Sequence, residues 1–406
     1  MLRNIVDLTD AEIRGKKIFL RVDFNVSINN GVVGQDYRIR MAIPTIEYLV
    51  KRGAIAILAS HLGKPPHPDP KYSLRPVAQR LSEIMRTNKV MFVNDCVGKI
   101  VHEEIDKMKI GEILLLENLR FHKEEESNDL GFSKQLSSLA DIYVNDAFSV
   151  SHRKHASTYG APKLFDAKLS GLNLKKEIEY LSNVRDNPIK PFILVIGGIK
   201  IKDKIGALEN LLPKADKVLL GGGTAFTFLK ASGIAVGTSP VQNEYLNWAA
   251  NAISEYKDKI MLPEDHIASS LSMTEKSNRS SSSGSTASIV KHIPEDMAGY
   301  DIGIKTVLRY SSEICGDTIP GTIFWNGPMG LFEIPQFANG TVNIARDIAL
   351  AFWRGSQTIV GGGDTVEALK VADVSEREVN HVSTGGGATL RFLAGNEMPG
   401  LDILKD

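Results

Sequence analysis

The first half of the chain alternates short apolar runs with amphipathic stretches. The apolar runs, which we expect to be strands, cover residues 17–26, 54–59, 91–93, 113–116 and 141–144. Between them, apolar residues recur at helical spacing from Arg38 to a closing glycine, Gly53, and again over 74–85 and 131–139. Strands that alternate with helices favour a parallel sheet covered by helices.

The second half repeats this rhythm, but its strands end in glycine. After a charged helical stretch over 173–185, apolar runs lead into glycines at five places. These exits are Gly197-Gly198, Gly221 to Gly223, Gly327 to Gly330, Gly361 to Gly363 and Gly385 to Gly387. In a parallel sheet such exits converge on one edge, where ligands usually bind.

The length of the chain, 406 residues, exceeds what one hydrophobic core usually serves. We expect an α/β protein with two Rossmann-like lobes, each a parallel sheet covered by helices, joined by a helical hinge. The expected divisions are an N-terminal lobe over 1–170, an interdomain helix over 171–187, a C-terminal lobe over 188–390 and a tail over 391–406.

Polar side chains follow the strands of the first half. In the first strand Arg21, Asp23 and Asn25 alternate with apolar residues and share one face. The polar residues expected at this edge are Arg21, Asp23, Asn25, His61, Lys64, Arg120, His152 and Arg153, with Arg38 close by. Guanidinium groups bind carboxylate and phosphate bidentately, so the set predicts a site for a small, multiply charged anion. A surface salt bridge is the alternative for any single member.

Arg38 adds to this prediction because it lies at the start of its helix. The helix dipole disfavours a cation at that end. A bound anion would remove the conflict.

The glycine edge of the second half predicts a nucleotide site. In Thr358 to Glu367, a strand, three glycines and a helix start form a cradle whose free N–H groups favour phosphate. Asp364 and Thr365 follow, with oxygen ligands of the kind that Mg²⁺ prefers. A plain packing turn is the alternative for one glycine triplet.

Two lysines and one glutamate complete the predicted nucleotide site. Lys200 and Lys204 are four residues apart, so we expect both on one face of a helix that begins after Gly198. Glu333 is expected to accept hydrogen bonds from ribose hydroxyls. The chain contains neither a P-loop nor a single Gly-x-Gly-x-x-Gly fingerprint after its first strand.

Composition excludes several classes of partner. The 48 basic and 48 acidic residues cancel, which argues against nucleic acid or a membrane surface. Cys96 and Cys315 lack metal-type spacing, and no signal peptide or membrane span is evident, so a reduced, cytoplasmic setting is expected. The serine-rich stretch from Ser269 to Ser288 is predicted to be a flexible surface loop.

Taken together, these motifs resemble the phosphoglycerate kinase family. The resemblance rests on Arg21–Asn25, Ser60–Pro65, Leu119–His122, Val144–Phe148, Gly197–Lys204, Phe324–Gly330, Gly361–Thr365 and Ser383–Gly387, which follow the family's order over the whole chain. The family usually has other residues at Lys64 (arginine), Ile199 (alanine), Lys202 and Ile304 (proline).

The resemblance implies a two-lobed enzyme that transfers a phosphoryl group from 1,3-bisphosphoglycerate to ADP, giving 3-phosphoglycerate and ATP. The implied substrate-binding residues are Arg21, Asp23, Phe24, Asn25, Arg38, His61, Leu62, Gly63, Lys64, Arg120, His152 and Arg153. The implied nucleotide-binding residues are Lys200, Lys204, Gly222, Asn326, Pro328, Glu333, Gly362, Gly363, Asp364 and Thr365, with Asp364 also serving Mg²⁺. The implied catalytic residues are Arg38, Lys200, Gly363 and Gly386.

The expected partners are therefore small molecules, and a monomer is expected, with a dimer as the alternative. In the reverse direction the phosphoryl acceptor is the carboxylate of 3-phosphoglycerate, which is already ionised at neutral pH. Positioning and charge stabilisation therefore suffice without a general base. Two other functions stay open from the residues alone. One is another ATP-dependent small-molecule kinase, and the other is a non-catalytic nucleotide sensor or scaffold on the same fold.

Overall fold

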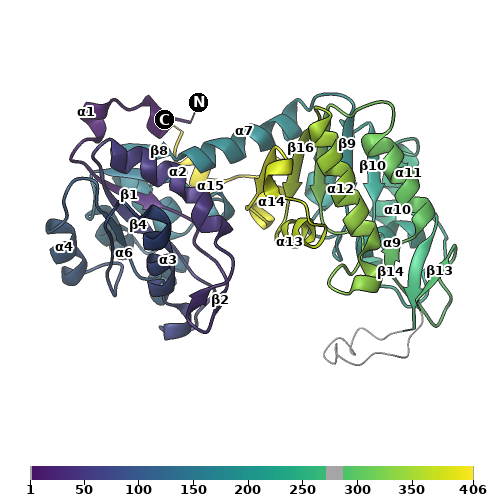
Figure 1. Ribbon diagram of the computed structural model, residues 1–406, viewed down its shortest axis with the longest axis horizontal. Helices are drawn as coiled ribbons and strands as arrows, with labels where there is room; N and C mark the ends of the chain where they lie inside the picture. The colour runs from purple at the N-terminus through teal and green to yellow at the C-terminus, as the bar shows by residue number, and fades with distance from the viewer. Residues whose placement is uncertain (1, 271–286, 406) are drawn as a thin grey trace. The chain divides into compact units, whose positions relative to one another are not determined.

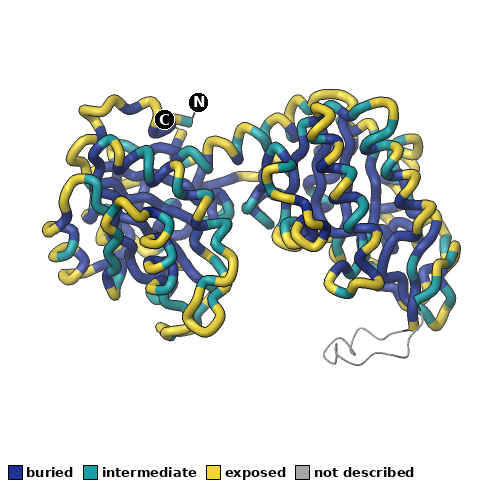
Figure 2. The backbone as a smooth tube through the Cα atoms, in the orientation of Figure 1, coloured by how far each residue is buried: buried dark blue, intermediate teal, exposed yellow. Residues whose placement is uncertain are grey.

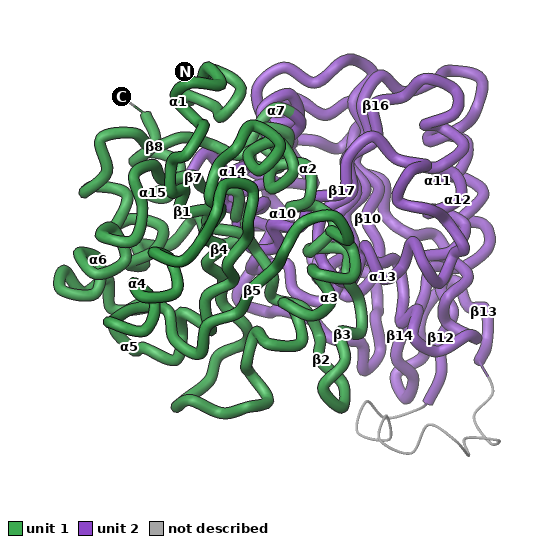
Figure 3. The backbone as a smooth tube through the Cα atoms, turned by 60° about the vertical axis from the view of Figure 1, so that its left-hand side comes forward, with its two compact units in different colours: residues 1–179, 397–406 green, residues 180–396 purple. Residues whose placement is uncertain are grey.

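The computed structural model describes residues 2–270 and 287–405, which form two compact units. Unit 1 contains residues 2–179 and 397–405, and unit 2 contains the described residues of 180–396. The boundary falls inside one helix, α7 (Leu172–Asp186), which is continuous across it. Figure 3 shows the two units in different colours.

Unit 1 is built on a six-stranded parallel sheet in the order β5-β6-β4-β1-β7-β8. The strands are β1 (Lys17–Arg21), β4 (Ile55–Ala59), β5 (Val90–Phe92), β6 (Ile113–Leu115), β7 (Ile142–Asn145) and β8 (Ala167–Ser170), with a hairpin of β2 (Ile28–Asn29) and β3 (Val32–Val33). The helices are α1 (Asp10–Ile13), α2 (Tyr37–Lys51), α3 (Arg75–Met85), α4 (Lys99–Asp106), α5 (Lys123–Ser127), α6 (Leu130–Ser137) and α15 (Pro399–Asp402).

Unit 2 has a second six-stranded parallel sheet, in the order β11-β10-β9-β15-β16-β17. Its strands are β9 (Phe192–Ile196), β10 (Lys217–Leu220), β11 (Ile260–Met261), β15 (Thr322–Asn326), β16 (Gln357–Gly361) and β17 (His381–Ser383). The helices are α8 (Ile205–Leu211), α9 (Gly222–Ala231), α10 (Leu246–Glu255), α11 (Ile304–Cys315), α12 (Asn339–Trp353), α13 (Gly363–Val371) and α14 (Gly387–Leu393). A small antiparallel sheet contains β12 (His266–Ser269), β13 (Ser288–Val290) and β14 (Ala298–Ile302).

The central strands of both sheets are buried on both faces, as their near-continuous apolar sequences predict (Figure 2). In unit 1 the side chains of α2 and α3 pack with alternate residues of β1 and β4 into one core. The predicted fold class is confirmed. None of the described helices is long and apolar enough to cross a membrane.

Three local predictions are corrected by the structure. The first strand ends at Arg21 rather than Val26, because side chains take over the backbone N–H groups that follow. The Ser60 hydroxyl accepts from the Phe24 amide at 2.9 Å, and Asp23 accepts from the Asn25 amide at 3.0 Å. These bonds hold Asp23 and Asn25 in a loop, so the binding rim lies beyond the strand and not on its face.

The helix expected to begin directly after Gly198 begins only at Ile205. The carbonyl group of Gly198 accepts from both the amide and the hydroxyl of Thr224, at 2.9 and 3.1 Å, so neither of its lone pairs is left for the first bond of a helix. Residues 199–204 are bends and turns without a helix, and Lys200 and Lys204 do not share a helix face.

The serine-rich stretch was predicted to be a loop throughout, but its described ends are strands. Ser269 is buried in β12, and Ser288 begins β13, which pairs with β12. Residues 271–286 of this stretch lie outside the described residues.

Glycines at the edge of the second sheet allow backbone segments to pack directly on each other. Gly327 has φ +95°, and a Cβ atom there would lie 2.5 Å from the carbonyl carbon of Gly197. Gly222 has φ +56°, and its Cβ would lie 2.8 Å from both the Gly198 nitrogen and the Pro328 oxygen. The strand exits are thus held together by contacts that only glycine permits.

This packing predicts different costs for two matched substitutions. Gly355 has φ +99°, close to that of Gly327, but no atom in the described part of the chain lies within 4 Å of its Cβ position. Gly355→Ala is expected to lower the free energy of unfolding by about 1–2 kcal/mol, the cost of positive φ. Gly327→Ala is expected to cost about 2 kcal/mol more, because the methyl group overpacks the backbone of Gly197. Urea unfolding measures both, and equal losses would contradict the packing role.

Candidate anion and nucleotide sites

Four arginines of unit 1 converge on one histidine at the end of the first sheet. His61 follows β4 and is 4% exposed. Burial lowers the pKa of His61 well below its usual value, and the positive charges of Arg21, Arg120, Arg153 and Arg38 lower it further. The imidazole is therefore neutral, and the surrounding positive charge makes this edge suited to an anion.

Arg21 reaches this cluster from the end of β1 and is fixed by its neighbours. Its Nη2 lies 3.2 Å from His61 Nδ1, and its Nε donates to the Ser157 hydroxyl at 2.9 Å. Ser157 in turn donates through its hydroxyl and its amide to Glu125, at 2.6 and 2.8 Å. Arg21, Ser157 and Glu125 are each at most 1% exposed. One bridging serine thus connects the buried carboxyl group of Glu125 to the guanidinium group of Arg21.

Arg38 lies in the first turn of α2, as predicted, and pairs with Asp23. Asp23 also accepts from the Ser149 hydroxyl at 2.5 Å. Burial lowers the pKa of the Arg38 guanidinium, while the carboxylate of Glu177 opposes the shift. The pairing with Asp23 offsets the unfavourable dipole at this helix end.

Arg120 lies in the short helix η3 (Leu119–Phe121) and contacts the loop after β4. Its Nη1 donates to the Gly63 carbonyl at 2.6 Å, and its Nε lies 3.2 Å from Glu126. The buried Nη2 atom has no hydrogen-bond acceptor among the described residues. Burying a guanidinium nitrogen without a hydrogen-bond acceptor destabilises the protein unless a ligand supplies the acceptor. Because the group is positively charged, an anion is the ligand that fits best.

The other predicted residues of this site surround the same loops. The Asn25 side chain accepts from the Gly63 amide at 2.8 Å, and His152 accepts from Arg153 Nε at 3.1 Å. Phe24 and Leu62 are buried, and their side chains support the loops instead of presenting polar groups. Lys64 is exposed.

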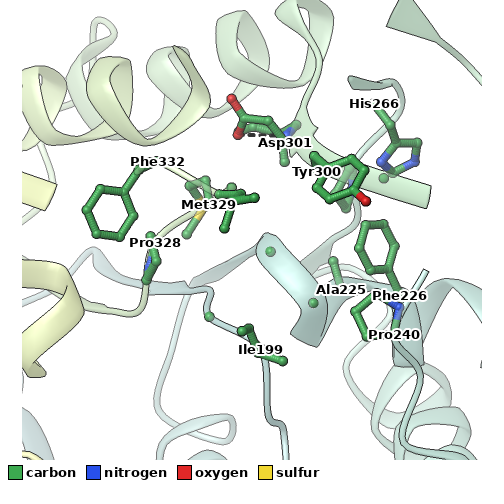
Figure 4. Close-up of a pocket in the computed structure, with 18 of the residues that line it drawn as sticks. Ile199, Ala225, Phe226, Pro240, His266, Tyr300, Asp301, Pro328, Met329 and Phe332 are labelled. Carbon is green, nitrogen blue, oxygen red and sulfur yellow. Dashed lines mark hydrogen bonds between the residues drawn. The ribbon is translucent and has the colours of Figure 1, made fainter. Parts of the chain in front are cut away.

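Unit 2 contains a pocket of about 140 Å³ at the glycine edge of its sheet (Figure 4). Its lining includes the predicted residues Gly222, Pro328, Glu333 and Asp364, together with Ile199. Most of the remaining lining is aromatic or apolar, which suits a flat base with few polar groups.

Several lining residues of this pocket were not predicted from the sequence. They are Phe226, His266, Tyr300, Asp301 and Phe332. Three of them belong to ring pairs: Phe226 lies tilted against His266, with a centroid distance of 5.9 Å, and Tyr300 stacks on Phe337, with a centroid distance of 4.7 Å. His266 and Tyr300 come from the antiparallel sheet, whose short strands gave no clear pattern in the sequence.

Lys204 is buried at the base of the glycine edge, and Lys200 is exposed in the loop before it. Lys204 Nζ donates to the Asn326 side chain at 2.8 Å. Burial lowers the pKa of Lys204, while the carboxylates of Asp203 and Asp364 oppose the shift. Asn326 also donates to the Gly361 carbonyl at 2.7 Å, so it connects Lys204 to the end of β16.

The glycines after β16 and β17 differ from those that pack on backbone. Among the described residues, no atom lies within 4 Å of a Cβ position at Gly363, Gly386 or Gly387. The absence of side chains there leaves open space in front of the helix starts of α13 and α14, where N–H groups are available to an anion. Gly362, with φ +105°, makes the turn into α13.

Asp364 and Thr365 have different environments, although they are neighbours. Asp364 is exposed in the first turn of α13 and lines the pocket. Thr365 is 1% exposed, and its hydroxyl donates to the Gly361 carbonyl at 2.9 Å while accepting from the Gly327 amide at 2.8 Å. This hydroxyl links the ends of β15 and β16.

The Arg21–Ser157–Glu125 network generates a stability prediction. Burial raises the pKa of Glu125, whereas Arg21 and the bonds from Ser157 lower it. If Glu125 is the ionised counter-charge, Glu125→Gln should lower the free energy of unfolding near neutral pH by about 3 kcal/mol. Glu124→Gln, one residue earlier in α5, should cost less than about 0.5 kcal/mol. Equal urea midpoints for the two variants would show that Arg21 has no ionised partner here.

Comparison with known proteins places this architecture in one family. The family model described as "Phosphoglycerate kinase" matches residues 8–396. A phosphoglycerate kinase of Dictyoglomus turgidum is 46% identical over 407 residues, covering 100% of this chain and 99% of the relative. A cytosolic phosphoglycerate kinase of Nicotiana tabacum is 42% identical, with 100% and 99% covered.

Solved structures agree with this result. The phosphoglycerate kinase of Coxiella burnetii superposes with a TM-score of 0.83 at 34% identity, covering 100% of this chain and 98% of the other. The similarity therefore extends over both units and the helix that connects them. This chain belongs to the phosphoglycerate kinase family.

Proposed function

We propose that this protein catalyses the reversible transfer of a phosphoryl group from 1,3-bisphosphoglycerate to ADP, giving 3-phosphoglycerate and ATP, in glycolysis and gluconeogenesis. The observation that carries the proposal is the arginine cluster around neutral His61, in a chain with a separate glycine-edged pocket. One site suits a small polyanion and the other a nucleotide, and membership of the family supports this pairing.

Unit 1 is proposed to bind the glycerate. Arg21, Arg120 and Arg153 would neutralise its phosphate and carboxylate groups, with Nη2 of Arg120 gaining the acceptor that it lacks among the described residues. Neutral His61 offers one ring N–H donor without adding a further charge. The full proposed set is Arg21, Asp23, Phe24, Asn25, Arg38, His61, Leu62, Gly63, Lys64, Arg120, His152 and Arg153.

Unit 2 is proposed to bind the nucleotide. The base and ribose would occupy the pocket lined by Gly222, Pro328 and Glu333, and the phosphates would lie at the open helix start of Gly363. The full proposed set is Lys200, Lys204, Gly222, Asn326, Pro328, Glu333, Gly362, Gly363, Asp364 and Thr365.

The residues present fit a magnesium ion that arrives with the nucleotide. Asp364 places an exposed carboxylate on the pocket, and Mg²⁺ typically takes one or two carboxylates, several waters and phosphate oxygens. The hydroxyl of Thr365 already joins two strand ends, so we assign the protein ligand to Asp364 alone. The bound ion would neutralise phosphate charge and orient the phosphoryl group.

Catalysis is proposed to rest on positioning and charge stabilisation. The carboxylate that accepts a phosphoryl group from ATP has a pKa of about 4 and needs no general base. Arg38, Lys200 and the helix-start N–H groups at Gly363 and Gly386 would stabilise the charge that spreads over the transferring group. Because the two substrates bind different units, transfer also requires hinge closure, which excludes water.

A coupled assay tests the proposed reaction directly. Purified protein should form ATP from ADP and enzymatically generated 1,3-bisphosphoglycerate, and it should form ADP from ATP with 3-phosphoglycerate. Transfer to another carboxylate but not to 3-phosphoglycerate would indicate a different small-molecule kinase on this fold. Nucleotide binding without transfer to any acceptor would contradict an enzymatic role.

Arg38→Ala and Lys200→Ala are expected to lower kcat by at least about a hundredfold while the protein remains folded, because each removes charge stabilisation from the transition state. Arg40→Ala and Lys202→Ala are matched controls. Arg40 is two residues along the same helix and pairs with Asp36, and Lys202 is exposed two residues after Lys200. Wild-type turnover in either catalytic variant would remove that residue from the mechanism.

Hinge closure predicts a change in the radius of gyration. Small-angle scattering should show compaction when 3-phosphoglycerate and a non-hydrolysable ATP analogue are both present, and less with either alone. Identical scattering curves in all four states would contradict closure.

We further propose a cytoplasmic location, which the name of the cytosolic tobacco relative supports.

A further inference from the structure

Outside the two sites described above, Asp95, Cys96 and His122 form a cluster in unit 1. One potential ligand atom from each residue lies within 4.8 Å of the other two. Asp95 and Cys96 follow β5, and His122 follows η3 after β6. Because β5 and β6 are parallel neighbours, both loops leave the sheet at the same edge. The Glu117 amide, which donates to the Asp95 carbonyl at 3.3 Å, connects the two loops.

Two of the three side chains are already oriented by their surroundings. Asp95 Oδ1 accepts from the Cys96 amide at 2.7 Å and lies 2.8 Å from His122 Nε2. The His122 ring stacks on Phe132, with a centroid distance of 5.2 Å. Cys96 is 1% exposed, whereas Asp95 and His122 are half-buried, so the cluster is open to solvent on the side of these two residues.

The acidic side chain of Asp95 lies next to the Cys96 thiol. Asp95 directly precedes Cys96 in the chain and accepts from its amide, and the ligand atoms of the two residues lie within 4.8 Å of each other. A carboxylate at this position favours a cation, and a metal ion bound to the sulfur would stabilise the thiolate directly.

We propose that Asp95, Cys96 and His122 bind one thiophilic divalent cation, with Zn²⁺ the best fit. A sulfur, an imidazole nitrogen and a carboxylate oxygen are the ligands that zinc uses, and water would complete four-coordination. Bond lengths of about 2.0–2.3 Å place the ligand atoms roughly 3–4 Å apart, and the observed ligand atoms lie within 4.8 Å of one another.

Binding would exchange protons for the metal ion. The Cys96 thiol releases its proton to solvent, and the proton of His122 moves from Nε2 to Nδ1, which leaves Nε2 as the ligand. Asp95 is already a carboxylate acceptor. The site is distinct from the proposed magnesium site, because all its residues belong to unit 1 and none contacts a nucleotide in the proposed function. No step of phosphoryl transfer requires this ion, so metal binding itself is the measurement.

Calorimetric titration of the reduced, EDTA-treated full chain with Zn²⁺, without nucleotide, tests the proposal. The wild-type protein should bind one equivalent. With Co²⁺ as the probe, a thiolate-to-metal charge-transfer band should appear. Cys96→Ala and His122→Gln should each weaken Zn²⁺ binding by at least about tenfold and abolish or reduce that band. Cys315→Ala and His102→Gln are matched controls, and both should bind as the wild type does.

Two outcomes would overturn the proposal. One is the absence of stoichiometric Zn²⁺ binding by the wild-type protein, and the other is equal affinity in the wild type and the Cys96→Ala variant. Asp95→Asn keeps the test decisive if the Cys96 or His122 variant unfolds, because the Asp95 side chain is 41% exposed and is not part of the apolar core. Circular dichroism confirms folding, and Asp95→Asn should lose affinity to a similar extent.

Discussion

In a parallel sheet the carboxyl ends of all strands lie at the same edge. Both the proposed anion site and the proposed nucleotide site of this protein depend on that constraint. In unit 1 the exits of β1, β4, β6 and β7 carry charged and polar side chains to one edge. In unit 2 the exits of β9, β10, β15, β16 and β17 carry glycines to one edge. The same topology therefore produces both proposed anion sites, one lined by side-chain charge and one by exposed backbone.

The side-chain site is destabilising in the absence of ligand. Gathering Arg21, Arg38, Arg120 and Arg153 around His61 concentrates positive charge in a desolvated region, and burial lowers the pKa of three of these guanidinium groups. Asp23 offsets part of the cost by pairing with Arg38, and Glu125, which Ser157 connects to Arg21, raises the pKa of Arg21. Nη2 of Arg120 retains no acceptor among the described residues, so the compensation is incomplete. An anionic substrate would bind to the positive charge that the protein's own carboxylates do not neutralise.

The glycine edge of unit 2 differs from the arginine cluster, because what it requires is an unusual backbone conformation and not the burial of charge. Gly197, Gly222 and Gly327 let three chain segments touch without side chains, which fixes the positions of the strand exits. Gly363 and Gly386 have open space instead, which leaves helix-start N–H groups accessible. A glycine triplet in the sequence does not reveal which of these roles each glycine has. The distinction depends on neighbours that are distant in the chain.

Sequence periodicity predicted the alternating elements and the two sheet edges, because strand and helix periods are local properties. The predictions that failed depended on tertiary hydrogen bonds. The helix expected after Gly198 is delayed because Thr224 occupies a carbonyl group that the helix would need. The aromatic lining of the pocket comes partly from β12 and β14, which are short and joined through a serine-rich stretch without periodicity.

The two kinds of site also explain why one chain needs both lobes for the proposed chemistry. A glycerate with two charged ends requires fixed, directional donors, which guanidinium groups supply. A nucleotide polyphosphate requires close approach over a larger surface, which bare backbone and a helix start supply. Neither edge alone offers both, because charged side chains would fill the space that the phosphates need. Separating them on two sheets lets each edge keep its own packing, and it leaves the alignment of the substrates to the connection between the units.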